Sequence, residues 1–421
     1  MSGYQSSAGR RRLSQAELDI IVAAHERLAA GKAGGKRASL RFSDLSELNL
    51  SGRDLSDADF SGSVFDGCKM IQARLPRANL FGCSFRGADL RHAVMNRADI
   101  RGACLRGANL AGADLTGADF REGQIAIPHP RKGLDVIRHE TRPGEADHAN
   151  FAGATLDGSN FDGVSAFAAD FTDSSLKGAK LSGANLKDAN MSGALLENVE
   201  FAGANMQGTR LTGAVVSGMD AAGMRLLGAD VSACLGAPNA DAARLDELLA
   251  RAAANKAWCQ SGGREHRPAS YDGEDLRALA AGLKGAVLTA MSAKGACMVG
   301  LDLSGAQLQG ANLEGADLRG ATLLGADLRG ARLAGANLTK TDLRKAVLCA
   351  LPLGPGRTTT TNMEQARLRY AALEAADLTG ALLDQADLAG ANFTGALLKG
   401  TSFRGAELSS AIGMDFGQQA A

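Results

Sequence analysis

Large apolar residues fall on every fifth position along most of the chain. From Leu40 to Ile125 all eighteen of these positions hold Leu, Phe, Met or Ile. The same spacing runs over residues 151–231 and 283–408, with two gaps in each run. A small residue, usually Ala, stands two positions before the large residue, and Gly commonly stands two positions after it. A period of five therefore governs most of the sequence.

This period fits neither a continuous helix nor a continuous strand. On an α-helix each step of five rotates the side chain by roughly 140°, which would spread the apolar positions around the cylinder. On a strand an odd step moves the side chain to the opposite face. The chain is therefore expected to turn once per repeat, with the small and the large residue inward and the residue between them outward. Gly suits the turn because it adopts a positive φ at low cost.

The prolines support a coil of short strands. Of eight prolines only Pro76 lies inside a repeat run, and the others fall in the interruptions. Stacked strands bond through backbone N–H groups, which proline lacks. The repeat runs are therefore expected to form hydrogen-bonded ladders.

Two segments carry a family resemblance. The sequences ANLAGADLTGADF at 108–120 and ANLEGADLRGATLLGADLRGARLAGANL at 311–338 resemble the A(D/N)LxG repeats of pentapeptide-repeat proteins. The resemblance implies an all-β solenoid, a right-handed quadrilateral β-helix with four repeats to a coil. Together with the predicted helices described next, the expected fold is this β-helix with short α-helical caps.

A helix is predicted ahead of each half of the repeat region. Residues 13–31 hold a capping box, Ser14 with Glu17, and end at Gly31. A second helix is predicted over 241–258. Each is interpreted as a lid over the open end of a coil, with Trp258 and Tyr271 packing in the second lid. The apolar face of the first helix is predicted to hold Leu18, Ile21, Val22, Leu28 and Ala29.

The two halves are predicted to be related by duplication. Aligning Gly35 with Gly263 also matches Leu75 with Leu303, and both runs then break at one place, at Ile125 and its equivalent Leu353. Because the repeats resume at 151 and at 363, the first insertion is predicted to be the longer. The expected organisation is an N-terminal tail and capping helix at 1–39, a first β-helix at 40–240 with an inserted loop at 126–150, a linker and second capping helix at 241–282, and a second β-helix at 283–421 with a short loop at 352–361.

Composition and charge exclude several classes of protein. Lys+Arg and Asp+Glu balance at 46 each, so the chain has no overall field for nucleic acid or an anionic membrane. No apolar run is long enough to span a membrane, and no secretory signal is visible. Seven cysteines without CxxC spacing indicate reduced thiols and a cytoplasmic protein. Cys68 and Cys83 occupy Ala positions and are expected to be buried.

The inserted segments hold the candidate site residues. The histidines of 126–150 are spaced ten and nine positions apart, too far for a typical metal motif, so no metal or cofactor is expected. The repeated Asp and Asn are interpreted as structural, and Thr358–Thr361 as a loop rather than an edge strand or a phosphorylation site. The loop at 126–150 is either a partner-binding element or a solvated excursion. The candidate interaction residues are His129, Arg131, Lys132, His139, Arg142 and Arg357.

The sequence is compatible with three functions. The favoured hypothesis is a non-enzymatic scaffold that presents a rigid rod and its loops to a protein partner of unknown identity, without nucleic acid or membrane. The resemblance also implies a second, a DNA-mimicking binder of a type II topoisomerase, which the neutral charge disfavours. Residues 40–125 carry eleven charges of each sign, where a mimic needs an acidic face. The third is an enzyme with its site in the insertions, although no nucleophile–base pair or phosphate loop is visible.

Overall fold

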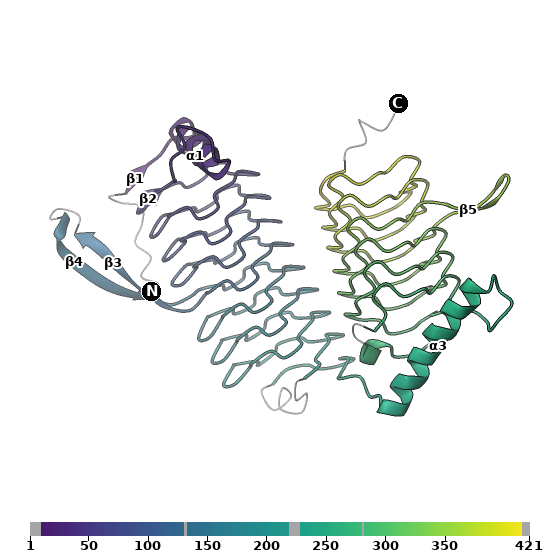
Figure 1. Cartoon of the computed structure of the whole chain (residues 1–421). Coiled ribbons are helices and arrows are strands. Elements are labelled where there is room, and N and C mark those ends of the chain that lie inside the picture. The colour runs from purple at the N-terminus through teal and green to yellow at the C-terminus, as the bar shows by residue number, and fades with distance from the viewer. Residues whose placement is uncertain (1–9, 130–132, 219–227, 280–281, 415–421) are drawn as a thin grey trace. The chain divides into compact units, whose positions relative to one another are not determined.

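The computed structural model describes residues 10–129, 133–218, 228–279 and 282–414. The chain divides into two compact units, Met1–Ala237 and Pro238–Ala421, called here the first and the second unit. Figure 1 shows a stack of similar coils in each unit, accompanied by one long helix.

Parallel β-bridges join residues twenty positions apart, so one coil contains four pentapeptides. Asp59 bridges Asn79, for example, and Asn79 bridges Asp99. Hydrogen bonds run in both directions along the stack: Phe60 N donates to Asn79 O, and Asn79 N donates to Ala58 O, both at 2.9 Å. The prediction that residues twenty apart lie above one another within an uninterrupted run is confirmed.

The core of each unit is a narrow column of the inward residues. Ala113 and Leu115 are fully buried, while Thr116 at the following corner is exposed. Cys68 and Cys83 are buried in Ala positions, as predicted. The inward assignment of the small and large positions is therefore confirmed.

The outward Asp and Asn residues hold the turns. The Asp114 carboxylate accepts hydrogen bonds from Thr116 N at 3.0 Å and Thr116 Oγ1 at 2.6 Å. The corner that follows, at Gly117, has a φ of 66°, a region that glycine enters without steric cost. Asx-turns of this kind recur along both units, which gives the repeated carboxylates a structural role.

The helix α1 (Gln15–Ala29) covers the first coil of the first unit. The predicted capping box of Ser14 and Glu17 is present, and Gly31 follows the helix with a φ of 66°. Leu18 and Val22 are buried as predicted, but Leu28 is 47% exposed. His25 takes the buried place instead, because its Nδ1 accepts a hydrogen bond from Ala38 N at 3.1 Å.

The outer edge of this first coil is covered in several places. The short strand β1 (Arg11–Arg12) pairs in parallel with β2 (Ser43–Asp44), and Leu13 N donates to Asp44 O at 3.0 Å. A coil without such partners would leave a row of open backbone groups. Side chains of α1 bond further backbone groups of this coil: Gln15 bonds both backbone groups of Asn49, Glu26 accepts from Asp54 N, and His25 accepts from Ala38 N.

The second unit begins with α3 (Ala242–Gln260), followed by the short 3₁₀ helix η1 (Arg277–Leu279). Asn255 is fully buried, and its amide donates to Val287 O at 3.0 Å and Thr289 O at 3.2 Å. Tyr271 is also buried and donates to Leu248 O at 3.0 Å, which confirms its predicted place in the lid. Trp258 is half-buried.

The first insertion is a β-hairpin, with boundaries that differ from the prediction. Its strands are β3 (Gly123–His129) and β4 (Gly133–Arg142). Cys104 bridges Glu145, where an uninterrupted coil would place Gln124 above it, so the run resumes at Ala146 and not at Phe151. The apolar period hid this return because Ala146 is a small residue in a large position.

The second insertion is a shorter hairpin of β5 (Leu351–Gly354) and β6 (Arg357–Thr359). Arg332 bridges Asn362, where an uninterrupted coil would place Pro352. The first insertion is longer than the second, as predicted. The difference in length is smaller than predicted, because the repeats resume at Ala146 and not at Phe151.

Two further predictions concern the structure of the second hairpin and the point at which both hairpins leave the coils. The interpretation of Thr358–Thr361 as a plain loop was wrong for Thr358 and Thr359, which belong to β6. Cys104 and Arg332 are the first positions in each unit whose bridge partner on the next coil lies beyond the insertion, and the alignment of Gly35 with Gly263 relates them to each other. Both hairpins therefore leave from the same point of the coil, as the matched interruptions predicted.

Candidate functional site

The hairpin β3–β4 stands out from the first unit (Figure 1), where a polar loop was expected. Its strands pair antiparallel, from Gly123 opposite Arg142 to His129 opposite Gly133, with a register shift after Pro128. Residues 145–150, expected to belong to the loop, lie in the coils, where Ala149 is buried. The projecting element is therefore ordered β structure of two strands.

The base of this hairpin is anchored on glycine corners of the coils. Ile125, expected in the core column, lies outside it, and a methyl group added at Gly82 would come within 2.7 Å of its Cδ1. A methyl group added at Gly62 would lie 3.1 Å from the same Cδ1 atom of Ile125. The Arg142 side chain is buried and donates from Nη1 to Gly82 O at 2.9 Å. Arg142 thus holds the hairpin in place and is not available as a surface contact.

A second arginine lies near this anchor. Burial lowers the pKa of Arg10, and the neighbouring Arg142 guanidinium lowers it further, while Asp44 and Asp66 act in the opposite direction. Arg142 also lies 3.5 Å from Glu140 Oε1. The effect of Arg142 on Arg10 indicates that the two guanidinium groups lie close to each other at the base of the hairpin.

The other candidate residues of the first insertion are not brought together in the described structure. His139 is exposed on β4, opposite Ala126. His148 lies in a coil with a φ of 56°, its ring 5.3 Å from Phe167 at an angle of 89°. The His129 side chain and all of Arg131 and Lys132 lie outside the described residues. In the described parts of the chain no three His, Cys, Asp or Glu residues are grouped as metal ligands.

The hairpin β5–β6 repeats the anchor in the second unit. The Cβ of Leu351 lies 2.8 Å from where a methyl group at Gly330 would stand. Thr361 closes the base, because its hydroxyl accepts from Gly330 N at 2.9 Å. Arg357 is exposed on β6, and Leu353 at the end of β5 is 52% exposed rather than a core residue.

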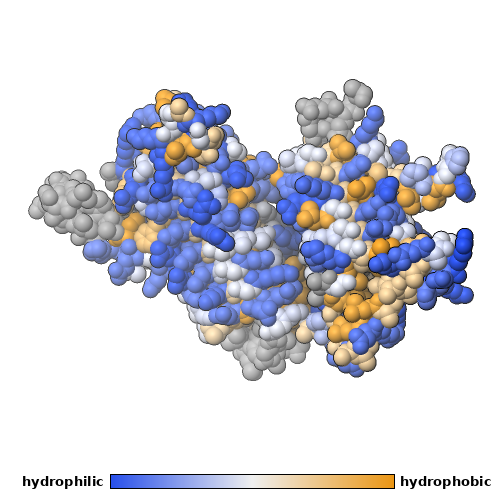
Figure 2. Space-filling view, in the orientation of Figure 1, coloured by the Kyte–Doolittle hydropathy of each residue, from blue (hydrophilic) through white to orange (hydrophobic). Residues whose placement is uncertain are grey.

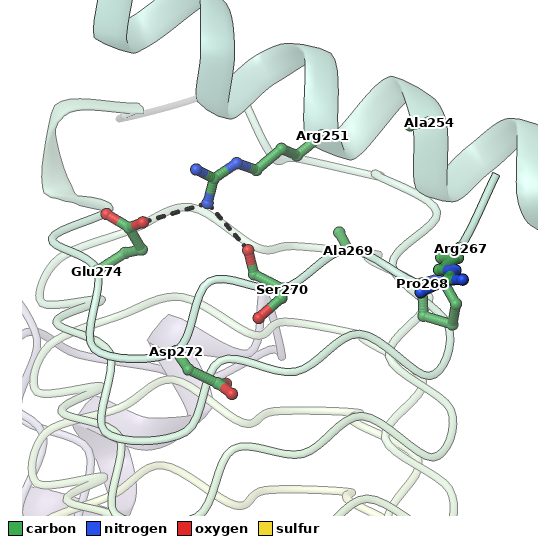
Figure 3. A pocket seen from close by; sticks show the side chains of 8 residues that line it. All are labelled: Arg251, Ala254, Arg267, Pro268, Ala269, Ser270, Asp272 and Glu274. Carbon is green, nitrogen blue, oxygen red and sulfur yellow. Dashed lines mark hydrogen bonds and ion pairs between the residues drawn. The ribbon is translucent and has the colours of Figure 1, made fainter.

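A pocket of about 380 Å³ lies between α3 and the start of the coils of the second unit (Figure 3). The Arg251 guanidinium crosses its upper side and donates from Nη1 to Ser270 O at 3.0 Å and Glu274 Oε1 at 3.1 Å. Sequence reasoning missed this pocket, since no residue of it belongs to a recognisable motif. Its lining residues are Arg251, Ala254, Arg267, Pro268, Ala269, Ser270, Asp272 and Glu274.

Charges on the coils are paired locally. Arg319 forms a fork with Asp317, two positions before it, at 2.7 Å, and Arg101 does the same with Asp99 at 2.8 Å. The visible surface of the first unit's coils is mainly hydrophilic in Figure 2. Pairing of this kind places charges of opposite sign side by side on these coils.

The buried thiols are not in reactive environments. Burial raises the pKa of Cys68, Cys83 and Cys104 to about 12. A thiol needs its thiolate form to act as a nucleophile, and this form is scarce at neutral pH when the pKa is so high. These three cysteines are packing residues.

Neither α1 nor α3, nor any other described helix, is long and apolar enough to cross a bilayer. No curated protein sequence matches the chain. Three solved structures are similar in part. A pentapeptide repeat protein from the thylakoid lumen of Arabidopsis thaliana is 27% identical over 27% of this chain and 69% of that chain, with a TM-score of 0.21.

The other two are less similar in sequence. Full-length QnrB1, a plasmid-mediated fluoroquinolone resistance protein, is 22% identical over 50% of this chain and 88% of that chain, with a TM-score of 0.20. HetL of Nostoc sp. strain PCC 7120 is a pentapeptide repeat protein involved in heterocyst differentiation regulation. It is 21% identical over 92% of this chain and 94% of that chain, with a TM-score of 0.13. These TM-scores are too low for a superposition of the whole chains.

The family model described as pentapeptide repeats matches in eight copies, which together cover about half of the chain. The matched residues are 43–80, 73–110, 83–121, 147–183, 179–218, 311–348 and 386–412. They coincide with coils that are joined by parallel bridges, twenty positions apart wherever no insertion intervenes. The chain belongs to the pentapeptide repeat family.

Proposed function

We propose that the chain is a non-enzymatic scaffold that presents β-hairpins from rigid β-helical rods to a protein partner. The observation that carries this proposal is the anchored hairpin β3–β4, whose base is fixed to the coils while His139 remains exposed. A strand pair on a rigid stack is preorganised, so binding loses little conformational entropy. Right-handed quadrilateral coils, as the family implies, would supply the rigid support.

The chemistry of the described residues supports an interaction role. The carboxylates that recur on the coils are engaged in Asx-turns and Arg–Asp forks, as at Asp114 and Asp317, and the buried thiols have raised pKa values. The same pairing of charges disfavours a DNA-mimicking binder, which needs a continuous acidic face. We propose a cytoplasmic location, in keeping with seven free cysteines.

The test is photo-crosslinking from the hairpin. A photoreactive amino acid at His139 should form a covalent adduct with one specific protein in native lysate, whereas the same group at the exposed coil residue Thr116 should not. A variant with 127–140 replaced by a short Gly-Ser turn keeps Ile125 and Arg142 and should lose that partner. If the shortened variant retains the partner, the hairpin is not the binding element.

A further inference from the structure

The first coils of the two units differ on one face. In the first unit, Asp44 bridges Val64 on the next coil, and β1 covers Asp44 from the other side. In the second unit, Ser270 bridges Ser292. Val64 and Ser292 correspond when Gly35 is aligned with Gly263, so Ser270 takes the place of Asp44 in its own unit.

No strand covers Ser270 in the described part of the second unit. The carbonyl of Asp44 accepts from the backbone N–H of Leu13, but the carbonyl of Ser270 accepts from the Arg251 side chain instead. The N–H of Ser270 has no acceptor among the described residues, and the residue is exposed. One strand edge therefore stays open where the first unit has closed it.

The pocket of Figure 3 lies at this open edge. Its inner wall is formed by Pro268–Ser270 and by Asp272 at the following turn, and α3 with Ala254 stands above it. The neighbouring Ala269 N–H is already bonded to Asn255 Oδ1 at 2.7 Å, so the opening is limited to the stretch around Ser270. An open edge beside a pocket is the arrangement that binds a peptide by strand addition.

We propose that this pocket receives an extended peptide of a protein partner, which adds as a parallel strand beside Ser270 as β1 does beside Asp44. A peptide carbonyl would accept from Ser270 N, and a peptide N–H would take the place of Arg251 at Ser270 O. The exposed position of Ser270 allows both bonds without unfolding the coil.

The charges along the pocket select the order of residues in the peptide. A parallel strand passes the exposed Arg267 first and the exposed Asp272 later. Asp272 is held in place because its Oδ1 accepts from Ser292 Oγ at 2.5 Å and Lys294 N at 2.8 Å. Glu274 is already bound by Arg244 and Arg251. The fitting peptide carries an acidic residue near its N-terminal end, small or β-branched residues in the middle and a basic residue after them.

This site is separate from the hairpin of the proposed function, although both serve protein binding. The two proposals can therefore fail independently. The hairpin-shortened variant should bind the peptide as the full chain does, and a loss of peptide binding in a Ser270 variant should leave the hairpin crosslink unchanged.

The experiment uses two blocked, fluorescein-labelled peptides with Val and Thr in the middle. One carries Glu before and Lys after them, and the other has the two charges exchanged. Fluorescence anisotropy with the full chain should show tighter binding of the Glu-first peptide, and hydrogen exchange should show slower exchange at Ser270 when it is bound. Ser270→Pro removes the donor without breaking an existing bond and should weaken binding about tenfold.

A second variant keeps the test decisive if Ser270→Pro fails to fold. Asp272→Asn retains an acceptor for Ser292 but removes the charge, so it should abolish the preference for the Glu-first peptide. Absence of binding for both peptides, or unchanged binding by a folded Ser270→Pro variant, would overturn the proposal. A lower molar mass of Ser270→Pro in light scattering would also overturn it, because a second copy of the chain would then be the occupant.

Discussion

Phe65 and Phe85 stack face to face, with ring centroids 4.9 Å apart and an interplanar angle of 6°. Phe151 and Phe171 repeat the arrangement with the same separation and angle. The spacing is close to that of neighbouring strands, so identical side chains on successive coils contact one another directly. Both pairs were predicted from the coil of four pentapeptides, and both are confirmed. The core is thus a set of stacked columns with little freedom in side-chain volume.

The Ala positions set the size limit of this core. Ala113 is fully buried, and Ala113→Leu is expected to lower the free energy of unfolding by about 1–3 kcal/mol through overpacking. Thr116→Leu, on the outward side, is the control and should be nearly neutral. Urea denaturation of both variants measures the difference, and equal stabilities would contradict the inward assignment.

The buried thiols offer a chemical test of packing. With a pKa raised to about 12, Cys68 and Cys83 should resist iodoacetamide at pH 8 in the folded protein. The half-buried Cys259 serves as the internal control and should be alkylated first. Mass spectrometry of tryptic peptides reports each site, and urea should make all of them reactive. Early modification of Cys83 without denaturant would show that the coils open locally.

The coils could be predicted from the sequence because each repeat carries its own signal. A large residue, a small residue and a corner residue recur every five positions, and their environments follow from alternation alone. The insertions could not be delimited in this way. Ile125 fits the period by chance but lies on a glycine corner, whereas Ala146 breaks the pattern and lies in the core.

The pocket beside Ser270 was hidden for a different reason. The pocket exists because no described strand covers the first coil of the second unit as β1 covers that of the first unit. It also depends on the contact of the Arg251 side chain with the backbone carbonyl of Ser270. Such contacts leave no local pattern. The buried His25 and Asn255 had a weak signal, a polar residue near the apolar face of each predicted helix, which becomes informative only when an open backbone edge lies opposite.

Two carboxylates should respond to pH with opposite sign. Burial raises the pKa of Glu374, so the folded state favours the protonated form of this carboxyl group. Its contribution to stability therefore declines as the pH rises above the pKa that the group has in the unfolded chain. The Arg332 guanidinium lowers the pKa of Glu314. The contribution of Glu314 to stability is therefore present at a pH above its pKa in the unfolded chain and is lost on acidification. At pH 7, Glu374→Gln should therefore raise the melting temperature and Glu314→Gln should lower it. Shifts of the same sign would contradict this assignment, and both differences should shrink toward pH 3.

The lid of the second unit depends on one amide. Asn255 is fully buried and donates to two carbonyls of the coil while accepting from Ala269 N. Asn255→Ala leaves three backbone groups without their partner, and about 3 kcal/mol of stability should be lost. Lys256→Ala, at the next, exposed position of α3, is the control and should change little.

Asn255→Asp separates hydrogen bonding from shape at this position. The carboxylate still accepts from Ala269 N. It has no donor for Val287 O and Thr289 O, and it places a second acceptor oxygen against these two carbonyls. Asn255→Asp should therefore destabilise the protein at least as much as Asn255→Ala. His25→Ala in the first unit removes a single bond to Ala38 N and should cost less than Asn255→Ala. Thermal unfolding followed by circular dichroism gives the order. A stable Asn255→Asp variant would mean that the amide does not seal the coil edge and that the other contacts of α3, such as Tyr271 with Leu248 and Arg251 with Ser270, are enough to hold it.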